Sequence, residues 1–193
     1  MKKKLLVVTL LSALAAPAFA KDDSGMYLVG TAGNTSNISN VENAPSLSGL
    51  IGYQFGYFFS VEGGMSLLVD KANYIVPPVG YTGVGSTYTS TSLAGSQFAA
   101  VIHLPMTDDL SILLRGGYTS MERTNAPSPP EVETAWKGNL YGLGVQYLLP
   151  YQFTNHKVRI GLRAGVDKYN LKDPTGLLTE TPTTTYVGGV IKF

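Results

Sequence analysis

Residues 158–169, VRIGLRAGVDKY, alternate between two kinds of side chain over most of their length. The apolar series is Val158, Ile160, Leu162, Ala164 and Val166, and the small or polar series is Arg159, Gly161, Arg163, Gly165 and Asp167. Because successive side chains of a β-strand point to opposite faces, this alternation predicts a strand with one apolar and one polar face. In a soluble sheet the apolar face meets the core, whereas in a membrane barrel it meets lipid and the polar face lines the interior.

The same alternation recurs along the chain and indicates which face meets lipid. Other apolar positions on the predicted outward face are Val61, Met65, Phe98, Ile102, Ile112, Leu114, Tyr118, Tyr141, Leu143 and Tyr147. A soluble lipocalin-like barrel would keep its apolar face inside and carry many charged residues outside. Only 14% of this chain is charged, and that is few for a soluble surface. We therefore predict that the apolar face meets lipid.

Eight such segments can be traced, and their connections differ in length. The segments are residues 26–34, 47–55, 58–69, 87–104, 110–121, 136–149, 157–170 and 183–193. Three connections are turns, at 56–57, 105–109 and 150–156, and four are longer loops, at 35–46, 70–86, 122–135 and 171–182. Short turns at one end and longer loops at the other are typical of bacterial outer-membrane barrels, whose strands need about ten residues. The predicted fold is all-β, an eight-stranded antiparallel up-and-down transmembrane β-barrel.

The first 20 residues have the three parts of a secretory signal peptide. Three lysines at positions 2–4 precede an apolar stretch at 5–15, and the sequence AFA at 18–20 is a typical cleavage site. The apolar stretch is too short to span a membrane comfortably, so we expect cleavage after Ala20 rather than an anchor. Residues 21–193 are then predicted to form one outer-membrane β-barrel domain.

Composition argues against several classes of function. Loss of the signal peptide would leave eleven basic against thirteen acidic side chains, a net charge near −2, so we expect no nucleic-acid partner. The chain has no cysteine, which excludes disulfides and Cys-based metal sites. His103 is expected inside near the turn end, and His156 in a turn. Neither lies beside a serine and an acid at the outer rim, so we expect no enzyme, metal or cofactor.

The chain ends TYVGGVIKF, with Val187, Ile191 and Phe193 on the predicted outward face. A terminal aromatic residue on such a strand resembles the C-terminal signal that the barrel-assembly machinery reads in outer-membrane proteins. This resemblance implies that Ile191 and Phe193 act in biogenesis, with the assembly machinery as a partner.

Several short motifs resemble the OmpA-type outer-membrane β-barrel family, in the family's order. They are Gly52-Tyr53-Gln54 followed by Val61-Glu62-Gly63-Gly64, Pro105-Met106-Thr107-Asp108-Asp109-Leu110 followed by Ile112 and Arg115, and Gly144-Val145-Gln146-Tyr147. Together they span most of the mature chain and resemble the transmembrane domain alone, a small barrel of the OmpX and OmpA kind. The resemblance implies an eight-stranded barrel in the outer membrane, which we expect to be a monomer. The family's periplasmic peptidoglycan-binding domain has no counterpart in these motifs, so cell-wall anchoring is not expected.

An interior layer of charged and amide side chains is the main candidate site. Eight strands leave an interior that side chains just fill, and the residues predicted at a similar height are Glu62, Arg115, Gln146, Arg159 and Arg163. A buried carboxylate is costly unless it is paired, and the arginine fork suits pairing in a confined space. We expect Glu62 to pair with Arg163 or Arg159. In the resembled family the position of Glu62 takes part in a salt-bridge gate, and Gln146 stands where the family has an acid.

This layer permits two interpretations, a polar plug that closes the barrel and a gated pore for small ions. A third interpretation is an adhesin that acts through loops at 43–45, 74–81 and 125–130, because loops on a rigid scaffold often carry function. We predict a structural and surface-interaction role, with the pore and the adhesin as alternatives.

Outer-membrane lipid and lipopolysaccharide are the expected partners, together with a possible host or surface ligand at the loops. Lys71, Arg123, Lys137 and Lys172 are predicted near the outer rim. Basic side chains at this height can meet lipid phosphates, and ordinary solvated rim residues are the alternative.

Overall fold

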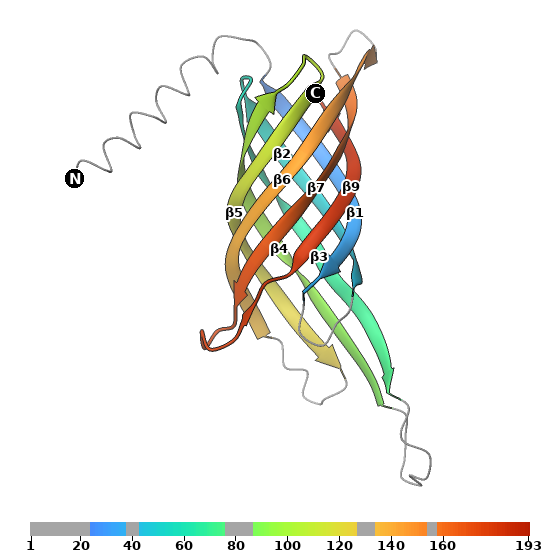
Figure 1. The fold of residues 1–193 in the computed structure, drawn as a ribbon, viewed down its shortest axis with the longest axis vertical. Helices are drawn as coiled ribbons and strands as arrows, with labels where there is room; N and C mark the ends of the chain where they lie inside the picture. The colour runs from blue at the N-terminus through green and yellow to red at the C-terminus, as the bar shows by residue number, and fades with distance from the viewer. Residues whose placement is uncertain (1–23, 38–42, 76–86, 127–133, 154–157) are drawn as a thin grey trace, which may run out of the picture.

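Eight long strands and one two-residue strand make up the part of the chain that the computed structural model describes, namely residues 24–37, 43–75, 87–126, 134–153 and 158–193 (Figure 1). The strands are β1 (Gly25–Ser36), β2 (Ala44–Phe55), β3 (Phe59–Ile75), β4 (Thr87–Pro105), β5 (Leu110–Ala126), β6 (Thr134–Phe153), β7 (Val158–Lys172), β8 (Thr179–Glu180) and β9 (Thr183–Lys192). Among the described residues, no helix has the length and hydropathy needed to cross a membrane.

The long strands pair with their neighbours in antiparallel fashion, and the sheet closes on itself. The order is β6-β5-β4-β3-β2-β1-β9-β7, and β6 also pairs with β7. The short strand β8 pairs with the end of β7. This arrangement confirms the predicted eight-stranded up-and-down barrel. Closure lets each long strand find partners on both sides, which a chain in hydrocarbon requires because no water is there to satisfy the backbone.

Several strands are longer at the loop end than the sequence predicted. β3 continues to Ile75 and β5 to Ala126, whereas the predicted ends were residues 69 and 121. Asp70 and Asn73 still pair with β4 in this extension. The difference arises because apolar alternation reports contact with lipid, and backbone pairing continues beyond the lipid with polar residues.

The two faces of the barrel agree with the alternation in the sequence. Leu143 and Leu162 are 58% and 60% exposed on the outside, whereas Glu62 and Arg163 are each 1% exposed inside. The turn between β2 and β3 is formed by Gly56, whose φ of 66° is readily adopted only by glycine.

The interior is divided into three zones along the barrel. An apolar cluster lies toward the loops, which are at the lower end of Figure 1. We call it the upper apolar cluster, with the loop end taken as the upper end of the barrel, and it is made of Ala44, Leu68, Leu93, Ala99, Met121, Trp136, Leu140, Tyr169 and Leu171. A second apolar cluster lies toward the turns and consists of Tyr27, Val29, Leu50, Leu148 and Val190. The charged side chains lie between and beside these clusters. The lumen is therefore filled by side chains, as expected for eight strands.

Candidate functional site: the interior charge layer

Glu62 on β3 is the centre of the interior charge layer. Its Oε1 lies 2.5 Å from Nη1 of Arg163 on β7, and its Oε2 lies 3.2 Å from Nη2 of Arg115 on β5. The hydroxyl of Tyr27 on β1 donates a hydrogen bond of 2.8 Å to Oε1. One carboxylate thus connects two buried guanidinium groups, and its own burial is compensated by charge and by hydrogen bonding.

Besides its pair with Glu62, Arg163 contacts Gln146 and the ring of Tyr27. Its Nε and Nη2 donate to Oε1 of Gln146 at 3.2 and 2.8 Å, since Gln146 is its direct cross-strand partner on β6. Its guanidinium carbon lies 5.7 Å from the ring centre of Tyr27, a contact in which an aromatic face attracts a cation. The predicted meeting of Glu62, Gln146 and Arg163 in one layer agrees with these contacts.

Asp167 is the acid that the sequence interpretation did not place in this layer. Arg115 forms an ion pair with Asp167 through Nη1 and Oδ2. The space for this pair comes from Gly142, which lies between them on β6, because a side chain there would meet Cβ of Arg115 at 3.2 Å. Two arginines and two carboxylates therefore balance, and the charge expected to be missing at Gln146 is supplied from β7. Asp167 is on the polar face of the alternation in β7, and this position was a signal in the sequence that could have identified it as an interior acid.

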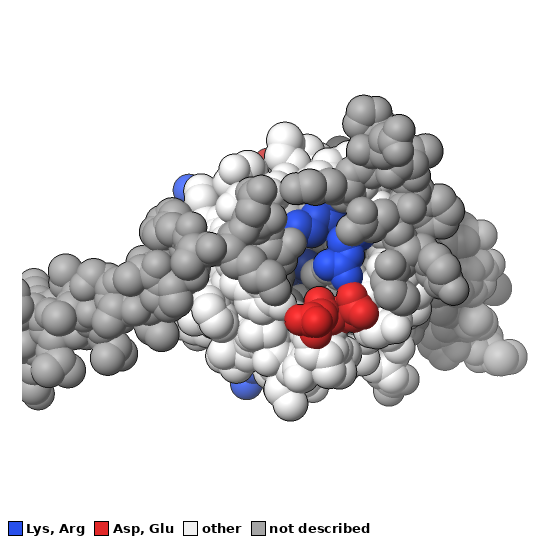
Figure 2. Space-filling view, turned by 90° about the horizontal axis from the view of Figure 1, so that it is seen from above, with Lys and Arg blue, Asp and Glu red and all other residues white. Residues whose placement is uncertain are grey.

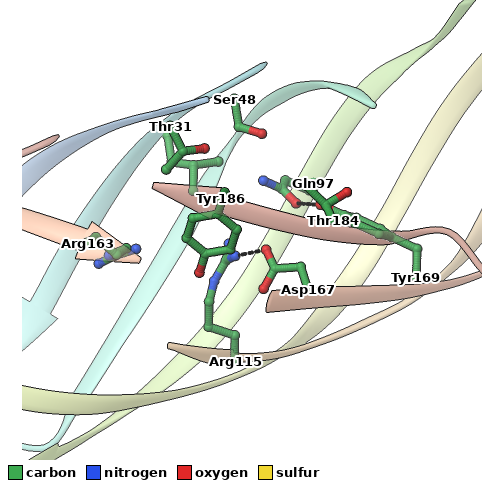
Figure 3. Close-up of a pocket in the computed structure, with 10 residues that line it drawn as sticks. Thr31, Ser48, Gln97, Arg115, Arg163, Asp167, Tyr169, Thr184 and Tyr186 are labelled. Carbon is green, nitrogen blue, oxygen red and sulfur yellow. Dashed lines mark hydrogen bonds and ion pairs between the residues drawn. The ribbon is translucent and has the colours of Figure 1, made fainter. Parts of the chain in front are cut away.

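A small cavity borders this layer, with room for about one water molecule. Figure 3 shows Arg115, Asp167 and Tyr186 pointing toward one another at its wall, with Arg163 at one side. Oδ1 of Asp167 and the hydroxyl of Tyr186 have no hydrogen-bond partner within the described part of the protein. The cavity is too small to form a continuous aqueous path along the barrel.

Arg159 lies away from this layer, which corrects one of the two pairings proposed for Glu62. It pairs with Asp109 in the turn between β4 and β5. The register between β6 and β7 shifts between Leu148 and Gln152, and Arg159 comes to lie opposite Gln152 near the turn end. Figure 2 looks onto the end that is uppermost in Figure 1 and shows basic side chains in the mouth with acidic ones beside them.

A hydrogen-bond chain connects the layer with the turn end of the lumen. The Ser60 hydroxyl lies 2.8 Å from both the Tyr27 hydroxyl and Nε2 of His103. Lys192 donates to Oε1 of Gln54 at 3.1 Å nearby in the lumen. His103 is 3% exposed, so it belongs to the packed interior, as predicted. His156 lies outside the described residues.

Arg123 lies near the loop end of β5, as predicted for a rim residue, but its side chain is engaged with other residues of the barrel and is not free to meet lipid phosphates. Its Nη1 lies 2.5 Å from Oε1 of Glu180 on β8, and its guanidinium carbon lies 5.9 Å from the ring centre of Trp136. Lys137 and Lys172 are exposed on the outside. The side chain of Lys71 lies outside the described ones, as do the signal peptide and residues 76–81 and 127–130 of two candidate loop segments. The third candidate segment, 43–45, is not an exposed loop as expected, because Ala44 and Pro45 begin β2 and Ala44 is buried in the upper apolar cluster.

The arrangement serves to obstruct the lumen, with a neutral ion-pair layer next to an apolar cluster. Within the described residues, no group of three or more His, Cys, Asp or Glu side chains is placed to hold a metal ion.

Ile191 and Phe193 are exposed on the outward face at the turn end. Their role in assembly, like cleavage after Ala20, stays a prediction.

Comparisons with known proteins agree on the kind of barrel. Residues 6–190 match the family model described as outer membrane protein beta-barrel domain. The fold is similar to Neisserial surface protein A (TM-score 0.61, 14% identity, 88% of this chain and 98% of that chain). It is also similar to the N-terminal β-barrel domain of Pseudomonas aeruginosa OprF (0.53, 15%, 89% and 100%).

A third similar structure is Ail, the attachment invasion locus protein of Yersinia pestis (TM-score 0.53, 12% identity, 88% of this chain and 97% of that chain). At these identities the three structures establish the shared fold. The comparison with curated proteins gave no match.

Proposed function

The chain belongs to the outer membrane protein β-barrel family and lies in the outer membrane, and on this basis we propose that it is a closed barrel with a structural and surface-interaction role. The observation that carries the proposal is the double obstruction of the lumen. The four charges of Glu62, Arg115, Arg163 and Asp167 neutralise one another, and the upper apolar cluster lies between them and the loops.

This obstruction favours a plug over a gated pore. Breaking the pair of Glu62 with Arg163 would open the charge layer alone. Trp136, Leu140 and Tyr169 would still fill the lumen on the loop side, where they are 0–4% exposed. A gate would need both zones to move together, which is a larger change than the exchange of one ion pair.

Planar-bilayer recordings test the closed barrel. We expect no discrete openings from the wild-type protein or from a Glu62→Ala variant, because the upper apolar cluster still blocks the lumen. A variant that combines Glu62→Ala with Trp136→Ala and Leu140→Gly is expected to leak ions. Discrete openings in the wild type, or a marked rise in conductance from Glu62→Ala alone, would instead favour the gated pore.

The surface part of the proposal is supported by the ribbon of β3 and β4. Pairing of β3 with β2 ends at Leu67, whereas pairing of β3 with β4 continues to Ile75. The two-stranded ribbon of β3 and β4 therefore extends beyond β2 toward the loop end (Figure 1). Two of the similar barrels carry names that refer to the surface or to attachment, and a surface role for this chain is a proposal from that likeness.

Whole-cell binding to host matrix proteins tests the surface role. Cells that express the wild-type barrel are expected to bind several-fold more matrix protein than cells without it, and deletion of residues 74–81 is expected to remove the difference. The control is heat-modifiable migration of the deletion variant, which reports an intact barrel. Equal binding with and without the gene would limit the role to a structural one.

A further inference from the structure

Three lysines lie together on the outward face of two neighbouring strands near the loop end. Lys137 on β6 and Lys172 on β7 are direct cross-strand partners, and Lys168 on β7 lies opposite Tyr141. Between these two rungs lie Asn139 and Asn170, which are also partners. All five polar side chains are exposed. Lys137 and Lys172 are predicted near the rim from the sequence, whereas their pairing and the places of Lys168 and the two asparagines follow from the strand register.

Like charges directly opposite one another destabilise a sheet. Cross-strand Cβ atoms are about 5 Å apart, so Lys137 and Lys172 face each other directly. Lys168 is four residues from Lys172 on β7 and therefore lies about 13 Å from it along the strand. Lysine side chains are long and flexible and can extend toward a polar interface, so Lys168 and the pair of Lys137 and Lys172 can reach toward the asparagine rung from opposite sides. The patch therefore contains two directly opposed cations and a third beyond the asparagine rung, and an anion bound between them would relieve the repulsion of Lys137 and Lys172.

Few acidic side chains are placed to neutralise this patch. None of the three lysines forms an ion pair within the described part of the chain. Asp173 follows Lys172 directly, but its carboxylate accepts from the Thr175 hydroxyl and from the N–H of Leu178, and these bonds lower its pKa. The carboxylate is thereby engaged in its own turn.

The strands on either side add one acid to this face. On β5, Glu122 lies opposite Ala135, one rung beyond Lys137 toward the loops. On β9, the outward neighbours of β7 are Thr183 and Thr185, which are uncharged. Among the described residues, the three lysines face two anions, Glu122 and Asp173, so this part of the surface keeps a net positive charge.

The height of the patch matches the headgroup region of the outer leaflet. Below it, the next rung is Leu143 opposite Val166, and both are apolar and exposed. Tyr118 and Tyr141 lie at the boundary and face outward, as expected for the aromatic girdle at a membrane interface. The lysines are on the side of the longer connections, which is the extracellular side in barrels of this kind.

We propose that Lys137, Lys168 and Lys172, with Asn139 and Asn170, bind the phosphate groups of lipopolysaccharide on the outer surface of β6 and β7. The lysines neutralise the phosphates, and the asparagine amides donate hydrogen bonds to phosphate or sugar oxygens between them. The inference rests on the proposed outer-membrane placement of this barrel end, but it does not depend on whether the lumen is closed.

The test uses the full mature barrel, folded in neutral micelles, and bisphosphorylated lipid A as the probe. A variant with Lys137→Gln, Lys168→Gln and Lys172→Gln is expected to bind the probe at least about tenfold more weakly, because each lysine near an anionic lipid surface adds to the attraction. Binding to the wild type is expected to weaken in high salt. The matched control, Glu122→Gln, leaves the lysines in place and is expected to bind as tightly as the wild type or more tightly.

Unfolding temperatures give a second measurement that a purely structural role would not produce. Without lipid A, the triple variant is expected to unfold at the same or a higher temperature than the wild type, because the repulsion of Lys137 and Lys172 is gone. With lipid A, the wild type is expected to gain stability and the variant to gain little.

Equal affinity of the variant and the wild type for lipid A would overturn the inference. Equal affinity of the wild type for lipid A and for phosphatidylglycerol would overturn the assignment to lipopolysaccharide. Neither result affects the closed-barrel proposal, which the conductance recordings test separately.

Discussion

Replacement of Glu62 with alanine is expected to lower the free energy of unfolding by about 3–5 kcal/mol, the usual cost of breaking a buried ion pair from one side. Glu62 is 1% exposed and is shared by Arg163 and Arg115. Its removal leaves two buried cations with Asp167 as their remaining carboxylate in the layer. Urea unfolding in lipid vesicles, followed by fluorescence of the single Trp136 and by heat-modifiable migration, measures the loss.

The control is Asp109→Ala, which breaks the pair with Arg159 near the turn end. The side chains of that pair are 30% and 20% exposed, so we expect a loss below about 1 kcal/mol. A second control removes both charges, with Glu62→Leu and Arg163→Met together. This double variant leaves Arg115 and Asp167 as a balanced pair and is expected to recover most of the stability, because apolar residues of similar volume can replace a buried pair. Equal losses for Glu62→Ala and Asp109→Ala would contradict a central role for Glu62.

Most of the fold prediction came from the alternation of apolar and polar residues along the strands, that is, from their parity. Alternation at residues 158–167 assigned Arg163 and Asp167 to the inside and Leu162 and Val166 to the outside, and both assignments agree with the structure. This inference is strong because a shift of one residue would move every side chain of the strand to the other face. Parity fixes the direction of a side chain but not its height in the barrel.

Height explains why the pairing of Arg159 was wrong. Its height was inferred by counting residues from a turn, and the irregularity in β6 and β7 between Leu148 and Gln152 changes that count. Asp167 was missed for the related reason that its distance from the other charges along the chain says little about neighbours across a tilted barrel. Gly142, which admits the pair of Arg115 and Asp167, shows its importance only when both partners are in place.

The upper apolar cluster was also beyond the sequence analysis. Leu140 had the parity of an inward residue, but the sequence does not tell an apolar plug from an isolated apolar side chain in a polar lumen. The cluster depends on residues from several strands, including Leu68, Met121 and Trp136. Their contact follows from closure of the barrel, and it changes the functional conclusion because it adds a second obstruction to the charge layer.

Leu143→Arg is expected to cost about 2 kcal/mol of folding free energy in a bilayer, because a cation within the apolar band on the lipid face must leave water. Leu143 is 58% exposed and lies beside Val166 in the outward apolar band. In water, an exposed leucine can be replaced by arginine with a change within about 0.5 kcal/mol. Folding yield and urea unfolding in vesicles measure the difference.

The depth control is Asn139→Arg, on the same strand and the same face but near the interface. It is expected to cost only about 0–1 kcal/mol, since its cation can reach the headgroups. Because Leu143 and Asn139 share a strand and a face, the difference between them reports depth in the bilayer rather than strand propensity or packing. If both substitutions had the same small effect, the apolar face would be in contact with water or protein. The assignment of that face to lipid would then be wrong, although Arg163 and Glu62 would still face the interior of the closed barrel.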